Sequence, residues 1–195
     1  MSLNNLSKVI AGALIVSTAT LLAACTGPDD TPMTTPPPSP TTTATATPSP
    51  TPTTDPDVAA AEVAILEAYR GYWATKVAIL ADPAVEPDGT LEAYAVDTAL
   101  TDVYSTVLDF RSDRIMMVGE PILSPTVTEV VTGPEGTATI ADCVDVADWQ
   151  PVFRDTLDSA AAPGQATRVS ATATAYFYDD RWTIRTYVVD REAPC

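Results

Sequence analysis

The sequence predicts one α+β domain in which N-terminal helices pack on a curved antiparallel sheet. Three observations predict this fold class. Apolar residues recur at helical spacing over residues 58–110, the spacing changes to every second residue after Arg114, and turn-forming residues separate the later segments. Helices followed by a run of strands are typical of an α+β arrangement.

Three helical segments are expected before Arg114. The first covers residues 58–81, with Asp57 as its cap, and a short second helix covers residues 91–96. A third helix follows a cap at Thr98 or Thr101. Its buried side would carry Leu100, Val103, Tyr104, Val107, Leu108 and Phe110.

Alternating segments predict the sheet. Strands are expected at residues 115–118, 126–132, 137–146, 167–178 and 181–190. The last two form a hairpin through Asp179 and Asp180. Alternate residues of the fourth strand, including Ala171, Ala173 and Ala175, face one way, and one face must meet the helices. These small alanines either let a helix approach closely or leave room for a cavity.

Residues 147–165 look like a long loop. It carries Trp149, Phe153 and Leu157 among polar neighbours. Exposed aromatic residues in a loop can mark a partner site. Alternatively, the segment folds back as a short helix that covers the sheet edge.

Residues 1–24 have the anatomy of a lipoprotein signal peptide. A polar start with Lys8 precedes an apolar stretch, residues 9–22, that is too short to span a membrane comfortably. The stretch ends in Leu22-Ala23-Ala24-Cys25, which looks like a lipobox whose cysteine thiol receives diacylglycerol. We therefore expect the chain to be anchored through Cys25 lipid at the outer face of the cytoplasmic membrane.

Residues 25–57 are expected to form a disordered linker between the lipid and a domain at residues 58–195. Threonine and proline dominate this segment. Such a composition cannot build a core, and proline favours the extended polyproline II conformation. The threonine density also suits O-glycosylation.

Composition excludes several classes of function. The formal net charge is −16, and residues 58–195 carry 9 Lys and Arg against 22 Asp and Glu, which makes nucleic acid a poor partner. The acidity either keeps an exposed domain soluble or serves a cationic ligand. The chain has no histidine, so Ser-His-Asp and Cys-His catalysis are excluded. We expect no cofactor.

Cys143 and Cys195 remain as an even pair once Cys25 carries lipid. In an oxidising compartment such a pair predicts a disulfide, which would stabilise the domain by about 4 kcal/mol in the chain-entropy model. The alternative is a metal site. Two thiols without histidine do not complete one, so we expect no metal.

Several short segments resemble a known family. They are residues 68–73 (Ala-Tyr-Arg-Gly-Tyr-Trp), 119–121 (Gly-Glu-Pro) and 141–145 (Ala-Asp-Cys-Val-Asp), together with Cys195. With the helical start and the curved sheet, they resemble the NTF2-like (SnoaL-like) cone fold, and more closely actinobacterial secreted lipoproteins of that kind. The resemblance covers roughly residues 59–195. It implies a helix-lidded sheet with a conical pocket and a possible homodimer through the sheet, but no particular reaction.

Asp142 is the candidate for catalysis. It shares a strand face with Ala138, Ile140 and Val144, and some enzymes of the superfamily, such as ketosteroid isomerase, use a pocket Asp as general base. A structural or surface role is the alternative. A set of aromatic residues could line the mouth of a cone or form plain core: Tyr69, Tyr72, Trp73, Tyr94 and Tyr104.

The leading functional hypothesis is a lipid-anchored envelope protein with a non-enzymatic domain. Its domain would bind a small apolar ligand or an envelope protein. The alternative is a small pocket enzyme of isomerase or lyase type that uses an Asp general base. An enzyme needs a secluded carboxylate near Asp142 with open cavity beside it.

Overall fold

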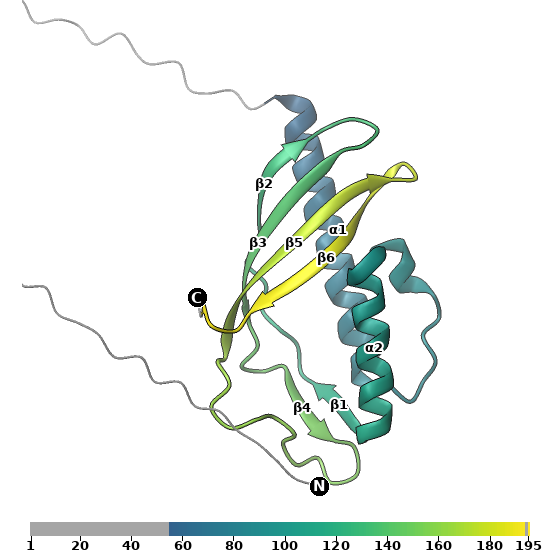
Figure 1. Ribbon diagram of the computed structural model, residues 1–195, viewed down its shortest axis with the longest axis vertical. Helices are drawn as coiled ribbons and strands as arrows, with labels where there is room; N and C mark the ends of the chain where they lie inside the picture. Colours follow the sequence, from purple (N-terminus) through teal and green to yellow (C-terminus); the bar gives the residue numbers. More distant parts are fainter. Residues whose placement is uncertain (1–54, 194) are drawn as a thin grey trace, which may run out of the picture. The chain divides into compact units, whose positions relative to one another are not determined.

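The computed structural model describes residues 55–193 and residue 195 (Figure 1). The predicted signal peptide, Cys25 and all but the end of the linker lie outside these residues, so those predictions stay predictions. The described part has its own hydrophobic core and a disulfide, which are the properties of a unit that folds independently. Neither of its two α-helices combines the length and the apolar character needed to cross a membrane.

Helix α1 (Pro56–Ala81) begins two residues before its predicted start. The capping prediction was wrong by the same two residues, because the Asp55 side chain accepts a hydrogen bond from the Asp57 amide at 2.9 Å. Pro56 fits the first helical position, because a backbone N–H at that position has no hydrogen-bond acceptor within the helix and its loss costs nothing. The buried side of α1 carries Ala61, Ile65, Ala68, Tyr69, Tyr72, Trp73 and Leu80.

The second and third helical segments are a 3₁₀ helix, η1 (Thr90–Ala93), and helix α2 (Asp97–Asp113). Neither predicted threonine caps α2. The Thr98 hydroxyl donates to the Arg185 carbonyl, and the Thr101 hydroxyl donates to the Asp97 carbonyl inside the helix. Helix α2 therefore begins without a side-chain cap.

The buried stripe of α2 is narrower than predicted. Ala99, Val103 and Val107 are buried at a spacing of four residues, whereas Leu108 is 62% exposed. Leu108 lies one position past Val107, about 100° further around the helix. Helix α2 packs against β6, β1 and α1, and the Leu108 position faces solvent.

Four antiparallel strands form the main sheet in the order β2-β3-β5-β6, and the predicted strand at residues 115–118 is not part of it. They are β2 (Thr126–Val131), β3 (Thr137–Asp145), β5 (Arg168–Tyr178) and β6 (Arg181–Asp190). Asp179 and Asp180 connect β5 to β6 with φ values of 52° and 59°. Positive φ at both positions is what a two-residue hairpin loop of this hand requires.

One face of the main sheet forms the core with α1 (Figure 1). Its alternation is regular: Ala138, Ile140, Asp142 and Val144 of β3 are buried, and so are Val169, Ala171, Ala173 and Ala175 of β5. Trp182 and Ile184 of β6 complete the same face.

A second, two-stranded sheet corrects the prediction of a long loop. Strand β1 (Ile115–Val118) pairs antiparallel with β4 (Gln150–Phe153), which lies inside the predicted loop. The strand was missed because it has four residues, contains Pro151 and buries only Val152. No helix forms here, and Phe153 at the end of β4 and Leu157 after it are exposed.

The predicted disulfide joins Cys143 of β3 to Cys195, with a Cα–Cα distance of 5.8 Å. The Arg168 guanidinium on the neighbouring strand donates to the Cys143 sulfur at 3.3 Å. The bond therefore fixes the end of the described chain against the middle of the main sheet.

Candidate functional site

Asp142 faces the interior and is only 5% exposed. The Tyr69 hydroxyl on α1 donates to Oδ2 at 2.9 Å, and the Ser124 amide donates to Oδ1 at 2.7 Å. Both carboxylate oxygens are therefore engaged by the protein itself. Burial is the main cause that raises the pKa of the Tyr69 phenol above its ordinary value, so this phenol stays a protonated donor.

This arrangement favours a structural role for Asp142. The residue lines none of the hollows described below, and general base catalysis needs open space in which a substrate can reach the carboxylate. The Tyr69–Asp142 hydrogen bond instead joins α1 to the central strand of the sheet.

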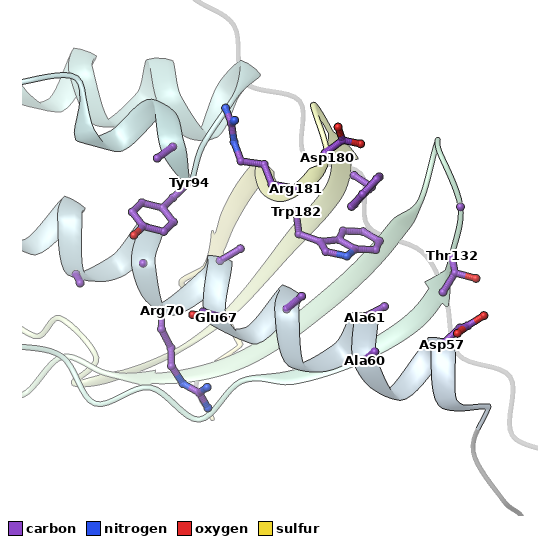
Figure 2. A pocket seen from close by; sticks show the side chains of 17 residues that line it. Asp57, Ala60, Ala61, Glu67, Arg70, Tyr94, Thr132, Asp180, Arg181 and Trp182 are labelled. Carbon is purple, nitrogen blue, oxygen red and sulfur yellow. The ribbon is translucent and has the colours of Figure 1, made fainter.

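An outer groove of about 900 Å³ runs along the N-terminal half of α1 (Figure 2). Figure 2 shows Trp182 and Arg181 of the β5–β6 hairpin on one side of it and Tyr94 toward one end. Gly71 lets the Tyr94 ring lie against α1, because a Cβ at this position would be 2.2 Å from the ring. The charged residues of the groove have both signs: Asp57, Glu67, Asp180, Arg70 and Arg181.

An inner cavity of about 550 Å³ lies where the main sheet meets β1, β4 and the two helices. Residues of the segment 160–167 also line it. Its volume is within the range of small-molecule sites in proteins. Large apolar and aromatic side chains form most of the wall: Trp73, Leu80, Phe110, Met117, Trp149 and Tyr187.

Lys76 lines this cavity under four aromatic rings, which we call the aromatic cage (Tyr72, Trp73, Trp149 and Tyr187). Its Nζ lies 4.5 Å from the ring centroids of both Trp73 and Tyr187. The Tyr72 and Trp149 centroids are 5.6 Å and 5.9 Å away. Distances below 6 Å are those of cation–π contacts, so the rings attract the ammonium ion.

The cage is itself held together by aromatic packing. The Trp73 ring contacts Trp149 edge-on with centroids 5.3 Å apart, and it meets Tyr187 at 90° with centroids 5.4 Å apart. Three separate parts of the chain supply these rings, namely α1, the turn before β4, and β6. The cage therefore exists only in the folded domain.

Lys76 has no carboxylate partner among residues 55–193, since none lies within 4.0 Å of its Nζ. Burial lowers the pKa of Lys76 to about 8, while the more distant charge of Asp102 on α2 acts in the opposite direction. Most of the lysine is thus still protonated at pH 7. The side chain keeps part of its surface accessible, as expected for a residue that lines a cavity.

Two indole N–H groups beside the cavity lack an acceptor in the described part of the chain, those of Trp73 and Trp149. The Trp73 group is close enough to the Tyr69 hydroxyl to oppose the rise of its pKa, although it does not reach hydrogen-bond geometry. Buried donors without a protein partner are rare.

The five aromatic residues selected from the sequence do not line one opening. Tyr69 and Tyr72 are buried in the core, and Trp73 lines the inner cavity. Tyr94 lines the outer groove. Tyr104 borders a third hollow, where its hydroxyl donates to Glu92 at 2.7 Å.

Sequence reasoning missed Lys76, Trp149, Tyr187 and Arg191 as cavity residues. One signal was available for Lys76, because it follows Tyr72 by four residues and Trp73 by three and therefore shares their helix face. It is also the only lysine after Lys8. Trp149 was singled out only as a loop aromatic that could mark a partner site, and the structure places it, half-buried, in the cavity wall. No signal pointed to Tyr187, since only the folded chain brings it to α1.

The fold and the site together define a class of protein: an α+β domain with a cavity of small-molecule size that opens to solvent at the segment 160–167. No family model and no curated protein matches the chain. Among solved structures, the intermembrane-space region of the chloroplast protein ARC6 is similar over 71% of this chain and 98% of that one, with 13% sequence identity and a TM-score of 0.38. A likeness of this strength supports neither a shared fold nor a shared function.

Proposed function

We propose that this chain is a lipoprotein of the outer face of the cytoplasmic membrane, and that its NTF2-like domain binds a small, largely apolar molecule. The observation that carries the proposal is the inner cavity of about 550 Å³ with aromatic walls. A cavity of this volume and lining can remove most of the surface of a small ligand from water. The Cys25 lipid would keep the binding domain outside the cell, at the membrane.

Binding without catalysis fits the residues of the cavity better than an enzyme does. The described lining includes no carboxylate, so an Asp general base is not at hand there. Asp142 has both oxygens occupied by Tyr69 and Ser124. The alternative of a pocket isomerase or lyase therefore lacks the group on which it depended.

The binding proposal can be tested on a secreted form of the chain, residues 26–195, which lacks the lipid. We expect the neutral dye Nile red to bind with one site and to quench the fluorescence of the cavity tryptophans, Trp73 and Trp149. Ala161→Phe, which places a ring at the cavity wall, should weaken binding at least about fivefold. Ala84→Phe, at an exposed turn outside the cavity, is the matched control.

Two results would contradict the binding proposal. Nile red that binds Ala161→Phe as tightly as the unchanged chain would place the dye elsewhere. If neither Nile red nor other neutral ring compounds bind the unchanged chain saturably, the ligand-binding cavity is contradicted. A thermal melt of each variant establishes that its domain is folded at the temperature of the binding measurement.

The anchor is tested separately. Labelled fatty acid should enter the unchanged protein but not Cys25→Ala, and extracytoplasmic protease should digest the protein on intact protoplasts. Equal labelling of the two proteins would show that Cys25 carries no lipid.

A further inference from the structure

We propose that the ligand of the inner cavity is an anion, a carboxylate on an apolar body, which Lys76 binds through its ammonium group. This inference rests on the proposed function, because it concerns the same cavity. The apolar body would lie against the aromatic cage and the neighbouring aliphatic wall. The carboxylate would accept hydrogen bonds from Nζ.

The first argument is the sign of the charges around the cavity. Residues 58–195 carry 22 acidic against 9 basic residues, so a typical hollow in this domain should be bordered mainly by carboxylates. The described lining of the inner cavity instead contains Lys76 and Arg191 and no acidic residue. The outer groove has the expected mixture, with three acidic and two basic side chains.

The second argument is that Lys76 lies among aromatic rings and has no carboxylate partner in the described residues. Surface arginines contact carboxylates in four places: Arg111 with Glu86, Arg114 with Asp155, Arg181 with Asp179, and Arg185 with Asp97. Lys76 is half-buried and has no such partner in the described residues. An enclosed charge without a counter-ion is unfavourable, and a bound carboxylate would supply one.

The aromatic cage alone does not complete the site. The faces of the four rings attract the ammonium ion, but a ring accepts a hydrogen bond from an N–H group less strongly than a carboxylate oxygen does. The cage also argues against a cationic ligand, because the chain's own lysine already occupies the position that an aromatic cage offers to a cation. Arg191, exposed after β6, adds a second positive charge at the cavity.

A pair of probes that differ only in charge can test the inference. Anthracene-9-carboxylate and anthracene-9-carboxamide have the same ring system, and palmitate presents a carboxylate on an acyl chain. For the secreted form we expect anthracene-9-carboxylate to bind roughly 10- to 100-fold more tightly than the carboxamide. A carboxylate on an apolar body can belong to a ring-containing acid or to a fatty acid. The relative affinities for anthracene-9-carboxylate and palmitate distinguish these two kinds of ligand.

Variants and an isotope label then assign the effect to Lys76. Lys76→Met should remove the preference for the carboxylate while the carboxamide still binds, and Arg181→Gln, which removes a distant positive charge, should change neither affinity. Residues 26–195 contain one lysine, so ¹⁵N- and ¹³C-labelled lysine gives a single set of side-chain signals. Those signals should shift when the carboxylate binds.

The pH dependence provides a further readout. The groups that face Lys76 are Tyr72 on α1, Asp102 on α2, and Tyr187 and Arg191 at the end of the sheet. Burial raises the pKa values of both phenols above their ordinary range. Lys76, with a pKa of about 8, loses its charge between pH 7 and pH 9. Carboxylate affinity should fall about tenfold over that interval.

Each contrary result has a distinct meaning. Equal affinity for the carboxylate and the carboxamide would overturn the anion inference and leave the binding function standing. A carboxylate preference that survives Lys76→Met would overturn the role of Lys76. If neither anthracene probe nor palmitate binds, the proposed function itself fails.

Discussion

Removing one oxygen atom from Tyr69 should measurably destabilise the domain. Tyr69 is fully buried, and its hydroxyl donates to Asp142 Oδ2 at 2.9 Å. The substitution Tyr69→Phe keeps the ring and its packing but leaves a buried carboxylate with the Ser124 amide as its remaining donor. Because a hydrogen bond to a charged group contributes about 1.5–3 kcal/mol, we expect the free energy of unfolding to fall by about 2 kcal/mol.

Tyr72→Phe is the matched control for that change. Tyr72 is 1% exposed and on the same helix, but no hydrogen bond to its hydroxyl is found among the described residues. Its substitution should alter the free energy of unfolding by less than about 0.5 kcal/mol. For a domain of this size, about 2 kcal/mol corresponds to a fall in Tm of roughly 8 °C.

Urea unfolding of the secreted form, followed by tryptophan fluorescence with the disulfide intact, measures both variants. Thermal melts followed by circular dichroism provide the second measurement. If Tyr69→Phe and Tyr72→Phe lose the same stability, or if neither loses any, the hydrogen bond to Asp142 does not stabilise the fold as argued.

Three further predictions concern stability. Burial raises the pKa values of Tyr69, Tyr72 and Tyr187, so the folded domain keeps three phenol protons that the unfolded chain loses above about pH 10. Lys76 has the opposite effect up to about pH 10.5, because its pKa is lowered in the folded domain. The free energy of unfolding should therefore fall by about 2 kcal/mol between pH 10 and pH 11, and a constant urea midpoint over that interval would contradict this. Gly119→Ala should lower the free energy of unfolding by more than about 3 kcal/mol, because φ is +77° and the new Cβ would lie 1.7 Å from a main-chain carbonyl oxygen. The control Gly164→Ala, where φ is +75° and the space is open, should lower it by about 1 kcal/mol. Equal losses in the two variants would show that the contact at Gly119 is relieved. Reducing the disulfide, which spans 52 positions, should cost about 4 kcal/mol, and an unchanged urea midpoint in dithiothreitol would refute that value.

Much of the secondary structure could be predicted because the patterns are long and regular. The strand at residues 181–190 has the predicted bounds, and β5 differs from its predicted range by one residue. β5 alternates over most of its length, so its period of two is unambiguous, and the Asp179-Asp180 turn then sets the start of β6. β4 could not be recognised, because its four residues include a proline and bury one side chain.

The helix caps were predicted less well because several neighbouring residues can serve equally. Asp55 and Asp57 both precede the apolar pattern of α1, and sequence alone does not distinguish them. At α2 the two candidate threonines turn their hydroxyls to carbonyl oxygens instead. A threonine hydroxyl has such alternatives within reach, so a capping pattern is weaker than an apolar one.

The candidate site was predictable only in part. Strand alternation placed Asp142 on the face that turned out to be buried, but its partner Tyr69 lies 73 positions away in the sequence. Lys76 escaped notice because a lysine in an amphipathic helix is ordinarily assigned to the solvent face. Its burial depends on Trp149 and Tyr187, whose approach to α1 is a property of the tertiary structure.

The alanines of β5 left open whether a helix or a cavity lies above them, and the structure resolves this by position along the sheet. Ala171, Ala173 and Ala175 are buried in the core that includes Tyr69 and Tyr72, and none of the three alanines lines the inner cavity. The cavity forms instead where β5 begins, beside the turn before β4 and the segment 160–167. Regular patterns thus specify the filled part of the core, whereas the proposed binding site depends on irregular segments. Because such segments position side chains without a repeating pattern, the site had to be found in three dimensions.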